Sequence, residues 1–325
     1  MHPAFSVVFL TTLIGAGQGL FLALFTVESY AAFGLLPLQS STFYAFGSLV
    51  ALILMGLGLF ASFFHLGRPE RAWRAATKWR TSWLSREVVV LPAFMGTLFL
   101  YGVAHWFEIN PVFAQLPSGA PVNITAVLGT LGTILAFALY ICTGMIYACL
   151  KFLREWHTPL TVINYILLGG ASGFSLAAAL AAYFAPEVMP VLAGWALIIT
   201  VLGLVGRAAT LIRNARLKPK STLQTAIGIK HPKIAQKTQG MMGGAFNTRE
   251  FFHGQSAALL GSLKWIFLLT AFVLPLMLLA AGLTQSAGNL LALAFVVQYL
   301  GLLVERWFFF AQANHPQNLY YQSVA

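Results

Sequence analysis

The basic residues of this chain lie on one side of the segments that hydropathy predicts to span a membrane. Eight apolar stretches approach the ~20 residues that a bilayer crossing needs. They cover roughly residues 5–27, 44–65, 87–107, 122–149, 161–184, 190–212, 263–284 and 290–312. The second, fourth and sixth connections hold all of the 19 Lys and Arg residues except Arg207, Lys264 and Arg306, which lie in the end turns of spans at the same face. Short basic loops stay cytoplasmic, so we expect both termini and the even-numbered connections to be cytoplasmic.

The composition favours an all-α integral membrane protein with one polytopic domain over residues 1–325. The chain is 59% hydrophobic and 8% charged, whereas a soluble domain carries about 25% charged residues. Its net charge of +11 would suit nucleic acid, but confinement to membrane-flanking loops is better explained by topology and by anionic lipid. We therefore expect membrane lipid, and no nucleic acid, as a partner. The eight spans are predicted to form two four-helix groups, spans one to four and five to eight.

The topology prediction can be tested by labelling thiols from outside the cell. Residues 66–86, 150–160 and 213–262 are predicted to be cytoplasmic because they carry the basic loops. A cysteine placed at Lys220 should therefore escape an impermeant reagent, and one placed at Ser118 should react with it. The opposite labelling pattern would place the basic loops outside.

The connection between the second and third spans carries the candidate chemistry. His65 ends the second span and Glu87 opens the third, so a helical hairpin brings both side chains to one membrane face. Ionisable groups at membrane depth are costly and suggest function. A quinol site needs a hydrogen-bonding group at the ring and an acceptor for its protons, which suits His65 as ring ligand and Glu87 as proton acceptor. The alternative is an interfacial histidine and a helix N-terminal acid favoured by the dipole.

The residues between this pair suggest a short amphipathic element along the membrane interface. Its cations recur at helical spacing, and its tryptophans suit the headgroup level. Arg86 directly precedes Glu87, Trp83 lies four residues before it, and Arg68 lies three residues after His65. We include these three in the candidate quinone-binding set. The two arginines have the alternative of pairing with lipid headgroups, Glu70 or Glu87.

Haem and iron–sulfur ligation are not expected in this chain. A bis-histidine haem needs two histidines that face each other inside the bundle. His65 and His105 lie near opposite membrane faces, and the other five histidines lie outside the spans. Cys142 and Cys149 lack the four-thiolate spacing of a cluster and are expected to be free thiols. We predict no metal site.

Other polar residues in the spans have structural and functional interpretations. Arg207, Lys264 and Glu305, near the inner ends of the last three spans, are expected to form a stabilising ion cluster; a proton route is the alternative. Gln18 and Gln298 are expected to make helix–helix hydrogen bonds.

The outer face offers fewer candidates. Glu28 is expected to be a plain interfacial acid, with a proton route to the outside as the alternative. His105 and Glu108 are three residues apart and are expected to pair with each other.

Three strings of residues resemble a known family. HLGRPERAWRA at 65–75 is followed by WRTSWLSRE at 79–87, the chain opens with MHPAFSVVFLTTLIGAGQGLFLALF, and FNTREFFHG occupies 246–254. Together these strings resemble the dimethyl sulfoxide reductase anchor subunits, the DmsC family, within the broader NrfD-like group of quinone-reactive membrane subunits.

This resemblance implies a non-haem anchor in the bacterial cytoplasmic membrane. The anchor would hold a four-cluster ferredoxin-like iron–sulfur subunit and a molybdopterin catalytic subunit. It would pass electrons between menaquinone or ubiquinone and the first cluster, and the substrate would be a sulfur compound, dimethyl sulfoxide or sulfite. The candidate docking residues on the basic face are Arg71, Arg74, Lys78, Arg80, Asn247, Arg249, Glu250 and His253.

Two other functions remain open from the sequence. A secondary transporter would need charges near the centres of several spans, whereas here the charges crowd the membrane faces. A purely structural tether would keep the basic docking face but give His65 and Glu87 no redox role. Saturable binding of a fluorescent quinol analogue would distinguish the quinone-reactive anchor from both.

Overall fold

The computed structural model describes residues 3–218, 221–235, 237 and 256–320. Its long helices, in chain order, are α1 (Phe5–Ala32), α2 (Ser41–Ser62), α3 (Trp83–Trp106), α4 (Ile124–Ala148), α5 (Pro159–Phe184), α6 (Met189–Ala215), α9 (Ala257–Leu268), α10 (Leu274–Thr284) and α11 (Gly288–Ala311). A π-helical segment, η4 (Leu269–Val273), joins α9 to α10 into one span. These helices form eight candidate membrane spans with mean hydropathy between 1.6 and 2.5, which confirms the predicted all-α membrane fold.

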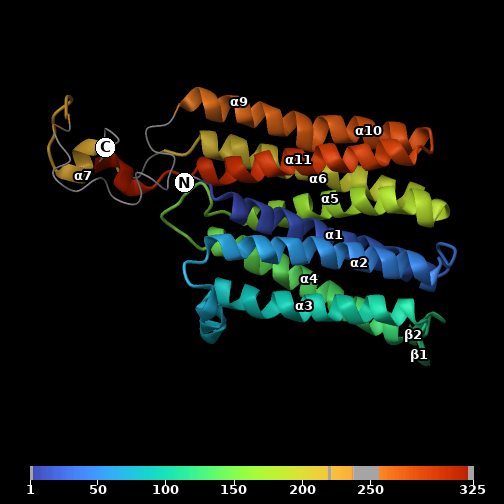
Figure 1. The fold of residues 1–325 in the computed structure, drawn as a ribbon. Coiled ribbons are helices and arrows are strands. Elements are labelled where there is room, and N and C mark those ends of the chain that lie inside the picture. Colours follow the sequence, from blue (N-terminus) through green and yellow to red (C-terminus); the bar gives the residue numbers. More distant parts are fainter. Residues whose placement is uncertain (1–2, 219–220, 236, 238–255, 321–325) are drawn as a thin grey trace.

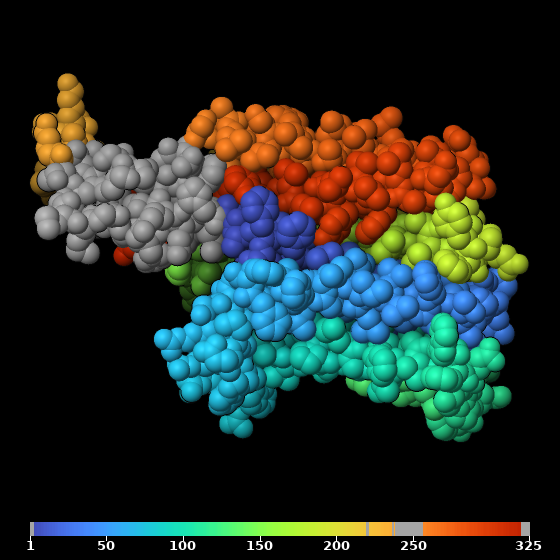
Figure 2. Space-filling view, in the orientation of Figure 1, coloured from blue at the N-terminus to red at the C-terminus, as the bar shows by residue number. Residues whose placement is uncertain are grey.

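Helices α1 and α5 form the centre of the bundle. In their most apolar windows 67% and 72% of residues are buried, against 28% to 44% in the other six spans. Figure 2 shows α1 only as a narrow strip between α2 and α11, because its neighbours cover it. Since α1 packs extensively on both α2 and α5, the contacts do not establish the predicted division into two four-helix groups.

Glycines let the backbones of α1 and α5 touch. A Cβ atom built on Gly173 would lie 2.1 Å from the carbonyl carbon of Gly19, and one built on Gly19 would lie 2.3 Å from the carbonyl oxygen of Gly169. Small residues at membrane helix crossings allow this close approach.

We expect Gly173→Ala to destabilise the bundle. The added methyl group would overlap backbone atoms of α1, which cannot move aside as a flexible side chain can, so the cost should be at least the ~1–3 kcal/mol of a typical overpacking substitution. The measurement is the thermal unfolding temperature of the purified protein in detergent. Gly194→Ala is the matched control, because a Cβ at Gly194 meets nothing within 4 Å. Equal unfolding temperatures for the two variants would contradict the crossing.

The two ends of the bundle differ in structure (Figure 1). One end carries the β-hairpin of β1 (Val112–Gln115) and β2 (Pro121–Asn123), which pair antiparallel. The other end, which the charge asymmetry predicts to be cytoplasmic, carries the remaining short elements. They are η1 (Phe63–His65), η2 (Pro69–Lys78), α7 (Leu223–Ile227) and η5 (Pro316–Tyr320). The first and last described residues also lie at this predicted cytoplasmic end, as an even number of spans requires. The short helix η3 (Pro186–Val188) joins α5 to α6 at the hairpin end.

The predicted amphipathic element is the 3₁₀-helix η2. Trp73 and Trp79 are exposed, and the Arg74 guanidinium lies 5.6 Å from the centre of the Trp73 ring. Exposed aromatic and cationic side chains are the composition of a headgroup-level segment. Its position at a membrane interface stays a prediction.

Candidate functional site

Glu87 faces the interior of the bundle from the second turn of α3. The side chain of Ser82 caps that helix by accepting a hydrogen bond from the amide of Ser85, 3.3 Å away. This cap fixes where the helix begins and therefore which face carries Glu87. The hydroxyl of Thr143 on α4 donates a hydrogen bond to the Glu87 carboxylate. A polar partner of this kind makes a carboxyl group tolerable inside a membrane protein.

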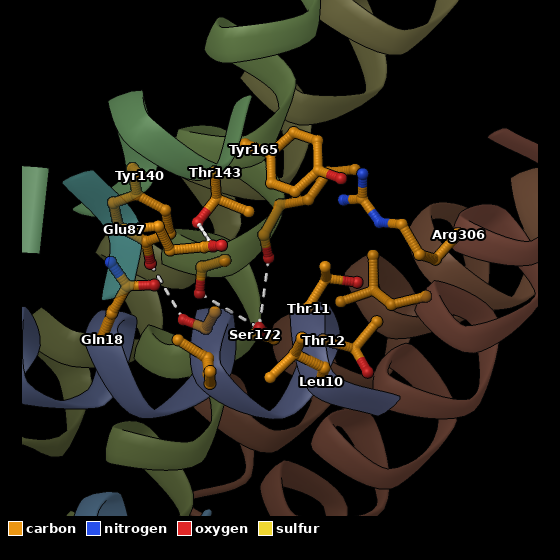
Figure 3. A pocket seen from close by; sticks show the side chains of 15 residues that line it. Leu10, Thr11, Thr12, Gln18, Glu87, Tyr140, Thr143, Tyr165, Ser172 and Arg306 are labelled. Atoms are coloured by element: carbon orange, nitrogen blue, oxygen red, sulfur yellow. Dashed lines mark hydrogen bonds between the residues drawn. The ribbon is translucent and has the colours of Figure 1, made fainter. Parts of the chain in front are cut away.

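Glu87 borders a small polar cavity between five helices (Figure 3). The cavity measures about 20 Å³, which is room for about one water molecule and far less than the ~300 Å³ of a small ligand pocket. Its lining residues are Leu10, Thr11, Thr12, Ile14, Gly15, Gln18, Glu87, Tyr140, Thr143, Tyr165, Leu168, Gly169, Ser172, Leu302 and Arg306. The cavity can therefore hold water beside Glu87 but not a quinone ring.

Hydrogen bonds to backbone carbonyls hold the polar lining in place. The Tyr140 hydroxyl donates to the carbonyl of Gly15 at 2.9 Å, and the Gln18 amide donates to the carbonyl of Ala136 at 2.9 Å. Both bonds join α1 to α4 and are buried, so they are costly to break. The cavity wall is thus a rigid part of the central packing.

A buried ion cluster lies on the opposite side of the cavity. Arg306 lines the cavity from α11, and its guanidinium carbon lies 3.8 Å from the centre of the Tyr165 ring. The neighbouring Glu305 carboxylate forms an ion pair with Arg207, with 2.8 Å between Oε1 and Nε, and lies 3.8 Å from the guanidinium of Arg306. The three charged side chains are each at most 6% exposed. The cavity therefore has a carboxylate on one side and an arginine on the other, as Figure 3 shows for Glu87 and Arg306.

His65 does not line this cavity. It ends η1, is exposed, and its Nδ1 lies 3.2 Å from the hydroxyl of Ser6 on α1. Ser6 precedes Leu10, the first cavity residue of α1, by one helical turn. The structure thus places His65 about one turn closer to the predicted cytoplasmic face than the nearest part of the cavity.

The other predicted ring-binding residues also lie outside the cavity. The Arg86 guanidinium lies 4.1 Å from the centre of the Trp83 ring, and it donates to the carbonyls of Trp79 and Arg80. Arg68 precedes η2 at its N-cap. The guanidinium of Arg86 is therefore already engaged with its own loop, which supports a role in shaping the segment more than in ligand binding.

The docking residues predicted on the basic face fall into two sets. Arg71, Arg74, Lys78 and Arg80 lie on or just after η2, and Arg71 makes an exposed 3.8 Å ion pair with Glu70. The second set lies outside the described residues and consists of Asn247, Arg249, Glu250 and His253.

The predicted ion cluster is present, but one of its three predicted members is wrong. Arg207 pairs with Glu305 as expected, but the third charged residue is Arg306. Lys264 instead lies 5.2 Å from the centre of the Trp265 ring. The interhelical hydrogen bonds expected of Gln18 and Gln298 are confirmed: the Gln298 carbonyl accepts from Ser175 at 2.6 Å, and its amide donates to Thr200 at 3.0 Å.

Two predictions at the outer face are wrong. His105 lies 3.7 Å from Glu28 rather than pairing with Glu108. The reason is that α3 ends at Trp106, and Glu108 adopts a left-handed backbone with φ of 54°. Glu28 is not a plain interfacial acid, because only 14% of its side chain is exposed and its carboxylate accepts hydrogen bonds from Tyr101 and Thr125.

Sequence reasoning missed Thr143, Tyr140 and Tyr165 as site residues. Hydroxyl-bearing residues are common in membrane helices, so nothing in their own segments marks them. The only signal for Thr143 would have been a rotation of the fourth span that turns this residue toward Glu87.

In the part of the chain that the structure describes, no three His, Cys, Asp or Glu residues come together as a metal site, and Cys142 and Cys149 are free thiols.

Comparison with known proteins agrees with this architecture. The sequence model of the DMSO reductase anchor subunit (DmsC) matches residues 1–321. The chain is 59% identical over 325 residues to a protein of Allochromatium vinosum that is named as a subunit of sulfite dehydrogenase, with 100% of both chains covered.

Proposed function

Because this chain belongs to the family of dimethyl sulfoxide reductase anchor subunits, we propose that it passes electrons between an iron–sulfur partner and the quinone pool. It is a multi-pass membrane anchor of a sulfur-compound oxidoreductase. The chain shares 59% identity with a sulfite dehydrogenase subunit, and this similarity narrows the proposed reaction to sulfite oxidation. The observation that supports quinone chemistry most is the polar cavity beside Glu87 at the basic end of the bundle.

The ring would bind on the cytoplasmic side of the cavity, next to His65. Quinone supplies the exchange of two electrons and two protons. The His65 imidazole would hydrogen-bond a ring oxygen, with Ser6 fixing the orientation of the imidazole. Since the cavity has room for water but not for a ring, Glu87 would exchange protons with the ring through that water. In sulfite oxidation Glu87 would deliver protons to the ring, and in the reverse direction it would accept them.

The basic end of the bundle would receive the soluble subunits, an iron–sulfur protein and a molybdopterin protein. Besides η2, it has a groove of about 540 Å³ whose lining includes Lys151, Arg154 and Lys218. Glu155 also lines this groove, and its partial burial raises the pKa of its carboxyl although Arg154 and Arg213 act in the opposite sense. An excess of cations suits a partner with an acidic surface, and cross-links to that partner should fall on the even-numbered connections.

His65→Ala is expected to weaken quinone binding. Loss of one hydrogen bond to a buried polar group typically costs ~1–3 kcal/mol, which is roughly a ten- to hundredfold rise in the KM for quinone. The measurement is quinone-linked sulfite oxidation in membranes that hold the assembled complex. His231→Ala is the control, because His231 is an exposed loop residue with a backbone partner. A KM equal to that of the control would move the ring away from His65.

A purely structural tether would give a different result. In that case quinone-linked activity would require a quinone site on another subunit, and no substitution at His65 or Glu87 would separate it from dye-linked activity. Measuring both activities on the same membranes tests the proposed function, because dye reduction needs only the soluble subunits.

A further inference from the structure

The outer ends of α1 to α4 enclose a second cluster of buried ionisable side chains, opposite the basic end. Glu28, Tyr44, Tyr101 and His105 converge there from three helices. Along α3, His105 lies 18 residues after Glu87, which at a rise of 1.5 Å per residue is about 27 Å. The outer cluster is therefore too far from Glu87 to be part of the first site.

Two polar atoms of this cluster have no hydrogen-bond partner in the part of the chain that the structure describes. The Tyr44 hydroxyl is one, and Tyr44 is 3% exposed; the other is Nε2 of His105, which is 7% exposed and lies 3.7 Å from a carboxylate oxygen of Glu28, beyond hydrogen-bond distance. The two rings are stacked with centroids 4.5 Å apart, so their polar atoms are held in place. Buried polar atoms are rarely left without a hydrogen bond, and two such atoms from different helices indicate a missing ligand.

Both residues line a cavity of about 720 Å³, within the range of small-molecule sites. Glu28 lines it as well and is oriented by the 2.6 Å hydrogen bond from the Tyr101 hydroxyl and by a bond from Thr125. The β-hairpin covers the outer side of the cavity through residues such as Leu116 and Val122. Among the residues that line the cavity, Glu28 can therefore accept hydrogen bonds, and Tyr44 and His105 can donate them.

The remaining wall belongs to the lipid-facing surface of α4. Val127, Leu131 and Ile134 line the cavity and are 50%, 45% and 61% exposed, and in a membrane such side chains face lipid. A ligand could therefore reach the cavity from the bilayer. No Lys or Arg is among the described residues that line it, so the site does not suit the phosphate of a lipid headgroup, which binds to cations.

We propose that this cavity is a second binding site, near the outer face, for the hydroxyl-bearing ring of a membrane-soluble quinol. One ring hydroxyl donates to the Glu28 carboxylate, and Tyr44 and His105 hydrogen-bond the ring oxygens, while apolar side chains of α1 and α4 contact the rest of the ring. The proposal rests on the proposed function only in the class of ligand, since none of these residues belongs to the site at Glu87.

Photolabelling of membranes that hold the assembled complex tests the second site. The probe is an arylazido quinone with a short prenyl tail, and labelled peptides are mapped with and without an excess of unlabelled quinol. We expect labelling of residues 101–134 that the excess quinol suppresses. Tyr44→Phe removes only an unpartnered oxygen, so the fold should persist, and it should raise the quinol concentration that suppresses half of this labelling about tenfold.

Matched variants separate the two sites. Tyr183→Phe is the control for Tyr44→Phe, because Tyr183 lies at the outer end of α5 and is 65% exposed; it should change nothing. Glu87→Gln should leave the outer labelling unchanged. Labelling of 101–134 that excess quinol does not suppress, or that Tyr44→Phe leaves unaltered, would overturn the second site alone. Absence of suppressible labelling anywhere in the chain would overturn the proposed function as well.

Discussion

Glu87→Gln should lower quinone-linked turnover at least about a hundredfold while leaving the complex assembled. The amide keeps the shape of the carboxyl group and can still accept the hydrogen bond from Thr143, but it cannot take up or release a proton. A positioned proton-transfer group typically contributes 10²–10⁴-fold to a rate. The KM for quinone should change much less, because the ring itself would bind next to His65.

The matched control for this substitution is Glu108→Gln, since Glu108 lies just beyond the opposite end of the same helix and is exposed. It should leave turnover unchanged. Dye-linked activity should survive in both variants, because the dye accepts electrons from the soluble subunits. Wild-type turnover in membranes carrying Glu87→Gln, with the complex intact, would remove Glu87 from the proton route.

Glu305→Gln should strongly destabilise the bundle itself. Glu305 is the carboxylate between Arg207 and Arg306, and all three side chains are at most 6% exposed. Removing one partner of a buried ion pair typically costs about 3–5 kcal/mol, because the remaining charge stays buried without compensation. Here two arginines would remain. We expect a large fall in unfolding temperature and in the amount of protein in the membrane.

Glu187→Gln serves as the control for charge removal, because Glu187 is exposed in η3. It should behave as wild type in both measurements. If Glu305→Gln were as stable as this control, the buried cluster would not hold α6 and α11 together, and its charges would be free for a role at the cavity.

The membrane architecture was predictable because it depends on local composition. A run of apolar residues long enough for a bilayer specifies a spanning helix whatever its neighbours are. The same holds for Glu87, since an acid near the start of an apolar span needs a partner wherever it lies. His65 was predictable as a residue at the same end of the bundle, because a hairpin joins its span to that of Glu87.

The partners of these residues were not predictable, because they depend on how the helices are rotated. Lys264 and Arg306 both lie near the inner ends of their spans, and hydropathy does not tell which one faces Glu305. The span of Lys264 also contains the π-helical segment η4, and one extra residue per turn changes which face points inward. The error at His105 has a similar origin, since its partner Glu28 comes from α1, which lies far from α3 in the sequence.

The most direct test of the quinone site is an equilibrium titration of membranes with a fluorescent quinol analogue. Wild-type membranes should show saturable binding with two components, one for each end of the bundle. The component at the basic end should weaken roughly ten- to hundredfold in His65→Ala and persist in Tyr44→Phe. A His65→Ala titration that superimposes on the wild-type curve would contradict the site proposed here.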